Sequence, residues 1–252
     1  AIAINHFHQD NIPFPGRAID NPPGHFNLFD LNDYSAQNYI CQLLDAIHFY
    51  GAKATGYLMA DPGWMYPDGK MPPMPDGGMA LPMPGMGPKE PECTETDRAR
   101  SAEDDNPPMD PISSYTKEMM ANYCRNVARE ASDLKRLGFD IISMHCCYRH
   151  SPHGRFLSPL TNGPQSVESR SKFMLEIYQA IRDAVGPNTP LEIVYSVDED
   201  SVGGYTVEDT IEFCKLADGL IDIIHLRSGE MDPQHPLGFT STEEMPTPYL
   251  EN

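Results

Sequence analysis

Short apolar segments alternate along the chain with longer segments in which apolar residues recur every three or four positions. The first pattern predicts buried strands, and the second predicts amphipathic helices that cover them. In segment 116–138, for example, Met120, Cys124 and Val127 share one helical face, and Gly138 follows as a C-terminal stop. The predicted strands are 1–5, 53–59, 139–145, 190–196 and 220–226, and the predicted helices are 35–51, 116–138, 169–186 and 206–219.

Five strands that alternate with four helices are typical of a parallel α/β sheet built from right-handed crossovers. An open doubly wound sheet and a (β/α)8 TIM barrel both fit this order of elements. No G-x-G-x-x-G follows any predicted strand, which argues against a dinucleotide-binding sheet. Position 56 is a glycine inside a predicted strand, where its propensity is unfavourable.

Residues 61–113 interrupt the alternation. They are dense in proline, glycine and methionine and then become acidic, so they predict a long loop insertion within a single domain that covers 1–252. A flexible linker is one interpretation of this insertion. A lid over an active site is the other, because loops that follow strands carry function and methionine adapts to apolar ligands.

The charge of the chain narrows the classes of partner. It has 37 acidic residues against 18 Lys and Arg, a net charge of −19, which repels phosphate backbones and anionic lipids. We therefore expect a small-molecule substrate, no nucleic-acid partner and no membrane partner. No apolar run approaches the roughly 20 residues of a spanning helix, and the first residues do not resemble a signal peptide. The six cysteines are spread thinly and do not form a disulfide framework, so we expect a reducing, cytoplasmic location.

Histidines cluster near the carboxyl ends of the predicted strands, where parallel α/β folds place their reactive groups. His6 and His8 follow the first strand, His145 closes the third and His225 lies near the end of the last. A metal site is one interpretation, although the two adjacent cysteines after His145 would point to opposite sides of an extended chain. The other is a pocket in which imidazole meets a carbonyl oxygen. Each histidine taken singly is also compatible with an ordinary loop or packing role.

Three motifs lie close together between 138 and 173. They are a G-F-D strand that ends in His, an F-L-S-P-x-x-N turn, and a helix start that contains S-x-E-x-R-x-K-F. This block resembles the Old Yellow Enzyme family of FMN-dependent NAD(P)H:flavin oxidoreductases and ene-reductases. Weaker similarity extends over most of the chain outside the insertion. The matching residues are Gly138, Phe139, Asp140, His145, Phe156, Leu157, Ser158, Pro159, Asn162, Ser166, Glu168, Arg170, Lys172 and Phe173.

The resemblance implies a TIM barrel with FMN at the carboxyl ends of the strands. Five of the eight β/α units are visible, and the resemblance makes them the second to the sixth. Five strands leave two edges and cannot close a barrel. We therefore expect either a piece of a longer protein or a homo- or hetero-oligomer whose other chain completes the barrel.

The resemblance also implies roles for individual residues. His145 takes the position of the histidine that hydrogen-bonds the substrate's carbonyl oxygen. Its partner position holds Tyr148, the position of the proton-donating tyrosine holds His150, and either residue is a candidate donor. The flavin-contacting positions on two strands hold Tyr57, where the family has Gln, and Val194, where the family has Arg. Tyr57 is also a candidate substrate-binding residue.

Three hypotheses follow. The first is a flavin-dependent oxidoreductase that reduces an activated C=C bond with NAD(P)H. The second is a non-catalytic, cofactor-less paralogue that acts as a subunit of a larger complex, which the residues at the flavin positions favour. The third keeps the barrel and replaces FMN by a metal bound to His6, His8, His145 and His225.

Overall fold

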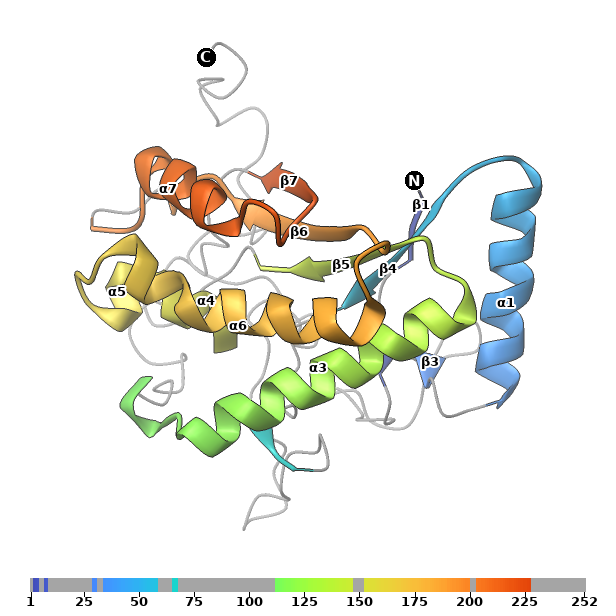
Figure 1. Ribbon diagram of the computed structural model, residues 1–252, viewed down its shortest axis with the longest axis horizontal. Helices are drawn as coiled ribbons and strands as arrows, with labels where there is room; N and C mark the ends of the chain where they lie inside the picture. The colour runs from blue at the N-terminus through green and yellow to red at the C-terminus, as the bar shows by residue number, and fades with distance from the viewer. Residues whose placement is uncertain are drawn as a thin grey trace, which may run out of the picture.

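The computed structural model describes residues 2–4, 7–8, 29–30, 34–58, 65–67, 112–146, 152–199 and 203–227. A five-stranded sheet with parallel neighbours lies at its centre (Figure 1). Its order is β1 (Ile2–Ile4), β4 (Ala54–Leu58), β5 (Ile141–His145), β6 (Leu191–Ser196) and β7 (Ile223–Arg227). All five predicted strands are thereby confirmed. A second parallel pair, β2 (Phe7–His8) with β3 (Phe29–Asp30), lies outside the prediction.

Four long helices connect the strands and confirm the four predicted ones. They are α1 (Tyr34–Phe49), α3 (Lys117–Leu137), α6 (Val167–Val185) and α7 (Val207–Ala217). Their starts are set by side-chain caps: the Thr116 hydroxyl accepts a hydrogen bond from the Met119 N–H, and Thr206 forms a reciprocal capping box with Asp209. Gly138 ends α3 in the left-handed conformation that glycine favours.

The segment between β5 and α6 differs from the prediction of a turn. It contains two short helices, α4 (Pro152–Leu157) and α5 (Pro159–Asn162). Ser158 separates them and caps α5, because its hydroxyl accepts a hydrogen bond from the Leu160 N–H at 3.2 Å. The F-L-S-P motif is therefore the end of one helix, a cap and the start of the next, since proline suits the first position of a helix.

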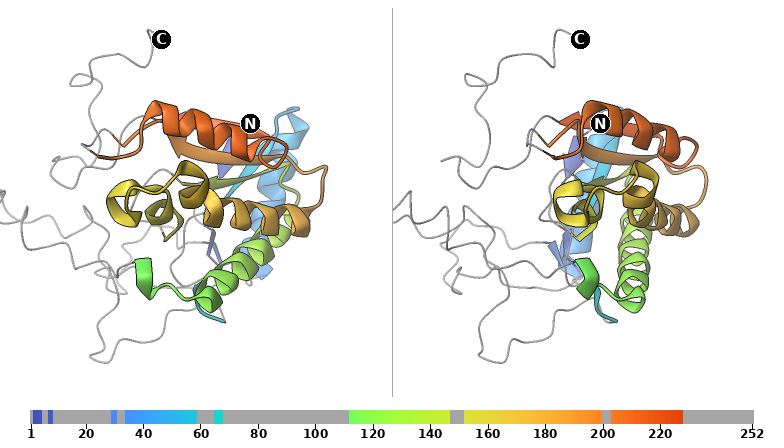
Figure 2. Two further views of the ribbon diagram at one scale, coloured as in Figure 1. Left: turned by 60° about the vertical axis from the view of Figure 1, so that its left-hand side comes forward. Right: turned by 90° about the vertical axis from the view of Figure 1, so that its left-hand side faces the viewer.

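The order of the strands confirms the barrel architecture that the family resemblance implies over the doubly wound sheet that the alternation of elements also fits. Each crossover moves one strand further in the same direction along the sheet, from β1 through β4, β5 and β6 to β7. Right-handed crossovers that all advance in one direction place their helices on one face of the sheet, and α3, α6 and α7 lie together in this way (Figures 1 and 2). A doubly wound sheet would reverse direction and cover both faces. The arrangement is that of a barrel segment.

The core lies between this sheet face and the helices. Tyr195 of β6 stacks on Phe213 of α7 with ring centroids 4.6 Å apart. A Cβ atom on Gly56 of β4 would lie 3.0 Å from the Leu134 side chain of α3. The close approach of α3 therefore explains why a glycine stands inside this strand despite its unfavourable propensity.

Part of the predicted insertion is described. Met65 is buried, and its carbonyl oxygen accepts a hydrogen bond from the Asn122 side chain at 3.1 Å. The Tyr66 carbonyl oxygen accepts one from Asn126 at 2.8 Å, so residues 65–67 are anchored to α3. A 3-10 turn at Ile112–Ser114 precedes that helix. The remainder of 61–113 lies outside the described residues, and the linker and lid interpretations both stay predictions.

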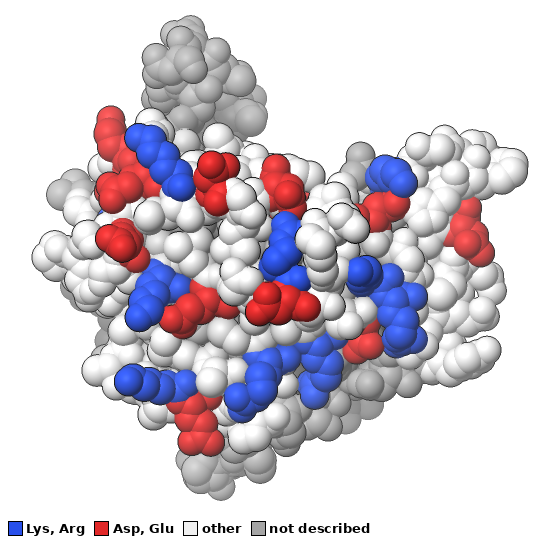
Figure 3. Space-filling view, in the orientation of Figure 1, with Lys and Arg blue, Asp and Glu red and all other residues white. Residues whose placement is uncertain are grey.

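The outer surface of the helix layer carries charges of both signs. Figure 3 shows basic and acidic side chains interspersed over the face that contains α3, α6 and α7, without a large area of one sign. Within the described part of the chain, no helix has the length and apolar character needed to cross a membrane.

Candidate functional site

The sheet face opposite the helices carries a group of polar and aromatic side chains near the carboxyl ends of the strands. Residues two apart on a strand share a face, so the positions that alternate with Gly56, Met144 and Tyr195 point away from the helices. The register places His145 of β5 beside Val194 of β6, and Val194 beside His225 of β7. We call Tyr57, His145, Val194, His225 and Arg227 the strand-end cluster.

His145 is the last residue of β5 and is half-buried. Burial, together with the smaller electrostatic effects of Arg227 and His225, lowers the pKa of its imidazole from 6.5 to about 4. The imidazole is therefore neutral at physiological pH. A neutral imidazole can donate a hydrogen bond to a substrate oxygen and accept one in return.

Two neighbours fix the surroundings of the His145 ring. Arg227 Nη1 lies 3.4 Å from His145 Nε2, and the Tyr57 ring lies edge-on with its centroid 5.9 Å away. A guanidinium can only donate, so Nε2 is the acceptor and the proton of the neutral ring resides on Nδ1. Tyr57 is buried. The structure thus brings together His145 and Tyr57, two of the candidate site residues, and adds Arg227, to which the sequence interpretation gave no role.

A buried series of hydrogen bonds connects α3 and α4 to the carboxyl end of β5. His153 of α4 is fully buried, and its Nε2 donates to the His145 carbonyl oxygen at 3.0 Å. Its Nδ1 accepts from the Tyr123 hydroxyl of α3, also at 3.0 Å. Burial lowers the pKa of His153 to about 3, so it remains neutral. No local pattern in the sequence predicts this role of His153, because the contact depends on how α3 packs.

The residues that carry the family resemblance have structural roles in this chain. The Arg170 side chain of α6 is buried, donates to the Leu157 and Gln165 carbonyl oxygens and forms an ion pair with Asp209 at 3.2 Å. The Ser158 hydroxyl donates to the buried Glu199 carboxylate at 2.9 Å. These residues therefore link the segment after β5, which follows His145, to the segment after β6.

Other predicted site residues have different outcomes. Tyr148, His150 and His6 lie outside the described residues, and the side chain of His8 is not described, so their roles stay predictions. His225 Nδ1 lies 3.3 Å from the Glu192 carboxylate. Within the described ranges, no three His, Cys, Asp or Glu side chains are grouped so that they could bind a metal ion. None of the four cysteines described there forms a disulfide bond.

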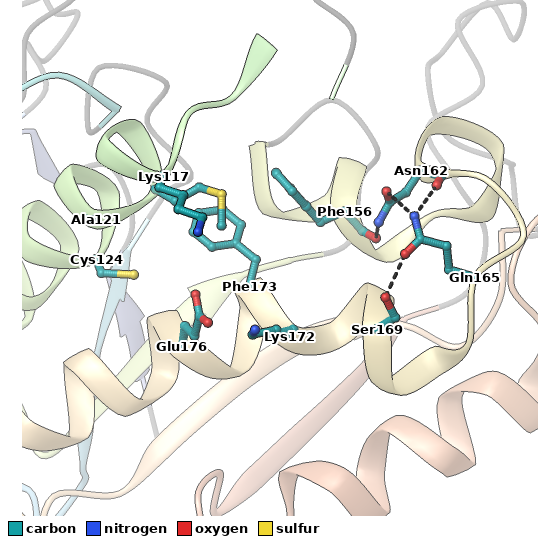
Figure 4. Close-up of a pocket in the computed structure, with 11 residues that line it drawn as sticks. Lys117, Ala121, Cys124, Phe156, Asn162, Gln165, Ser169, Lys172, Phe173 and Glu176 are labelled. Atoms are coloured by element: carbon teal, nitrogen blue, oxygen red, sulfur yellow. Dashed lines mark hydrogen bonds between the residues drawn. The ribbon is translucent and has the colours of Figure 1, made fainter. Parts of the chain in front are cut away.

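A pocket of about 450 Å³ lies elsewhere, between α3, α6 and the α4–α5 segment (Figure 4). Lys117, Phe156 and Glu176 line it, and no residue of the strand-end cluster does. Its thiol, Cys124, has a pKa raised from 9.0 to about 11, first by burial and then by the charge of Glu176. The thiol is protonated at neutral pH and is a poor nucleophile.

A parallel sheet wound in one direction, with ionisable side chains near the carboxyl ends of its strands, defines a TIM-barrel-type protein. No family model matches the sequence. The NADPH dehydrogenase of Listeria monocytogenes serotype 4b (strain CLIP80459) is 26% identical over 217 residues, which cover 82% of this chain and 55% of that protein.

Solved structures agree with this relationship. Histamine dehydrogenase from Rhizobium sp. 4-9 matches with a TM-score of 0.53 and 25% identity over 78% of this chain and 27% of its own. The Old Yellow Enzyme homologue from Zymomonas mobilis matches with a TM-score of 0.51 and 18% identity over 80% and 55%. The chain is a distant homologue in the Old Yellow Enzyme and NADPH dehydrogenase family, and it spans about half the length of the curated relatives it matches.

Proposed function

We propose that the protein containing this chain is a cytoplasmic, flavin-dependent oxidoreductase of the Old Yellow Enzyme type, which uses NAD(P)H to reduce an activated C=C bond. The observation that carries this proposal is the placement of His145: a neutral imidazole at the carboxyl end of a barrel strand, held from behind by His153. An N–H donor in this position stabilises the negative charge that develops on a substrate's carbonyl oxygen during reduction. The distant relationship to NADPH dehydrogenases supports the reaction class.

The described residues supply this site in part. Tyr57 lies beside His145 and is proposed to contact the substrate. Tyr148 and His150 are proposed as proton donors on the strength of the family resemblance. When bound, FMN would supply the hydride. However, Val194 is apolar and only 1% exposed, so its side chain cannot donate the hydrogen bond expected at this flavin position.

The Val194 observation favours a second candidate function, a non-catalytic subunit that keeps the fold without the cofactor. The two candidates differ in one measurable property. We would express the full-length protein with FMN and reductant present. Its absorbance would then be recorded between about 350 and 500 nm, where bound flavin absorbs. A stoichiometric flavin spectrum that bleaches on addition of NADPH supports the oxidoreductase. Colourless, folded protein overturns it and supports the non-catalytic subunit.

The edges of the sheet bear on the assembly of the protein. β1 and β7 are the two edge strands, and the apolar residues Ile223 and Leu226 of β7 are 38% and 54% exposed. An exposed strand edge offers unpaired backbone groups to another strand. We propose that further strands pair with β7 and β1, from the same polypeptide or from a second chain in a homo- or hetero-oligomer. Measuring the mass of the full-length protein in solution distinguishes these sources.

A further inference from the structure

Arg227 reaches across a neighbouring strand to meet His145. It is the last residue of β7, whereas His145 ends β5, and β6 lies between them in the sheet. On the same face β6 presents Val194 and Ser196, which pair in register with His225 and Arg227. Both side chains on β6 are short, so the long arginine side chain can pass over them. Its Nη1 lies 3.4 Å from His145 Nε2.

The contact between Arg227 and His145 is weak enough for a ligand to replace it. At 3.4 Å it is longer than an ordinary N–H hydrogen bond of about 2.7–3.2 Å, and it joins a cation to a neutral nitrogen. A guanidinium has five N–H donors in a planar fork, which matches the two oxygens of a carboxylate. Arg227 is exposed, so an incoming anion can reach it. A charge-assisted bond to that anion is stronger than the existing contact to imidazole.

The electrostatic surroundings favour the same class of ligand. The Arg227 guanidinium is a permanent cation that lies beside the His145 ring. It places a positive charge at this end of the sheet, on a chain whose net charge is −19. It attracts a small anion locally, whereas the overall charge repels polyanions.

We propose that Arg227 and His145 form a binding site for the carboxylate of a small-molecule substrate, with the guanidinium as the principal donor. The carboxylate would be the group that activates the adjacent C=C bond. Only this last assignment, of the carboxylate to a substrate that is reduced, rests on the proposed oxidoreductase function.

Cinnamate and cinnamamide test the proposal, because they have nearly the same shape and differ in charge. Titration of the full-length protein in a calorimeter should show that cinnamate binds about tenfold tighter or more, which corresponds to about 1.4 kcal/mol. Arg227→Gln should weaken cinnamate binding by about tenfold and change cinnamamide binding by less than about twofold. Arg227→Lys, which keeps the charge but loses the fork, should lie between.

Lys215→Gln is the matched control, since it removes one exposed positive charge from α7 on the helix side of the sheet. It should leave both affinities unchanged. Equal binding of the two ligands by the unmodified protein, or unchanged cinnamate binding in Arg227→Gln, overturns the proposal. If Arg227→Gln does not fold, Arg227→Lys and the salt dependence decide: cinnamate binding alone should weaken between about 0.05 and 0.5 M salt.

The flavin measurement separates this inference from the proposed function. Protein that lacks flavin but prefers cinnamate in the manner described supports the carboxylate site and overturns the oxidoreductase. Protein that binds flavin, reacts with NADPH and binds the two ligands equally supports the oxidoreductase and overturns the carboxylate site.

Discussion

The two ends of the parallel strands use ionisable side chains in opposite ways. At the amino ends, Asp140 precedes β5 and accepts hydrogen bonds from the Ala54 N–H at 2.9 Å and from Lys53 at 2.7 Å. Asp222 precedes β7 and accepts one from the Leu191 N–H at 2.8 Å and one from Arg182 at 2.6 Å. Each aspartate thus binds the first residue of the neighbouring strand.

The pKa shifts of Asp140 at the amino end and of His145 at the carboxyl end favour opposite charge states. Hydrogen bonds from Lys53, Ala54 and His48 outweigh the opposing effect of burial and lower the pKa of Asp140 from 3.8 to about 2, which keeps its carboxylate ionised. Burial, with smaller electrostatic effects of Arg227 and His225, lowers the pKa of His145 to about 4, which keeps its imidazole neutral. The amino ends satisfy their charges internally and stabilise the sheet. The carboxyl ends hold a neutral imidazole and an exposed guanidinium, in line with the division of labour in TIM barrels.

The largest expected effect on stability comes from His153, which hydrogen-bonds the carboxyl end of β5. Replacement of His153 by Leu leaves the Tyr123 hydroxyl and the His145 carbonyl oxygen buried without their partner. We expect a loss of about 2–4 kcal/mol in the free energy of unfolding, measured by urea denaturation of the full-length protein. A loss below about 1 kcal/mol would contradict the role assigned to His153.

The free energy of unfolding should also depend on pH through His153. The pKa of His153 in the folded protein, about 3, lies below its ordinary value of 6.5, so between these values the unfolded chain binds a proton that the folded protein does not. Stability should therefore fall as the pH is lowered from about 6.5 towards 3. His153→Leu should flatten this part of the stability curve. An unchanged slope in the variant would show that another group is responsible.

A smaller effect is expected at the amino end. Asp140→Asn should lower the free energy of unfolding by about 1–2 kcal/mol, an estimate reduced because the site is partly open to solvent. The stabilisation by Asp140 is present above its ordinary pKa of 3.8 and is lost as the pH falls through about 2. The variant and the unmodified protein should therefore converge in stability near pH 2. Asp222→Asn, the equivalent change before β7, should behave in the same direction.

Tyr123→Phe should have a still smaller effect, of about 1 kcal/mol, because it removes one hydrogen bond and keeps the buried ring. His153 would retain its bond to the His145 carbonyl oxygen. A thermal melt beside that of His153→Leu would show whether the two changes share one network. Combined with His153→Leu, Tyr123→Phe should add almost nothing, since its partner is already absent. Full additivity would contradict the network.

The smallest effect on stability is expected for His145 itself. Asn in its place keeps the backbone carbonyl that His153 binds and removes a half-buried ring at the strand end. We expect a change below about 0.5 kcal/mol in the free energy of unfolding. Circular dichroism in urea checks this. A loss comparable to that of His153→Leu would show that His145 is a structural residue and would remove the contrast between the two ends.

Local pattern was enough to predict the central sheet and the long helices of this fold. The five strands and four long helices follow from the periodicity of apolar residues. Thr206 and Asp209 form the capping box that marks the start of α7. Such signals are local because strand and helix bury one face with a fixed period. His145 closes β5, where the G-F-D strand placed it.

The tertiary structure decided which side chains meet. The alternation of strands and helices fits both a doubly wound sheet and a barrel, and the family resemblance favours the barrel. The strand order confirmed the barrel, because order depends on pairing between distant segments. Arg227 lies 82 positions from His145 in the chain, and Tyr123 lies 30 from His153. No periodicity links positions so far apart. The sequence determined that a histidine ends a buried strand, and the register of three strands decided that an arginine stands beside it.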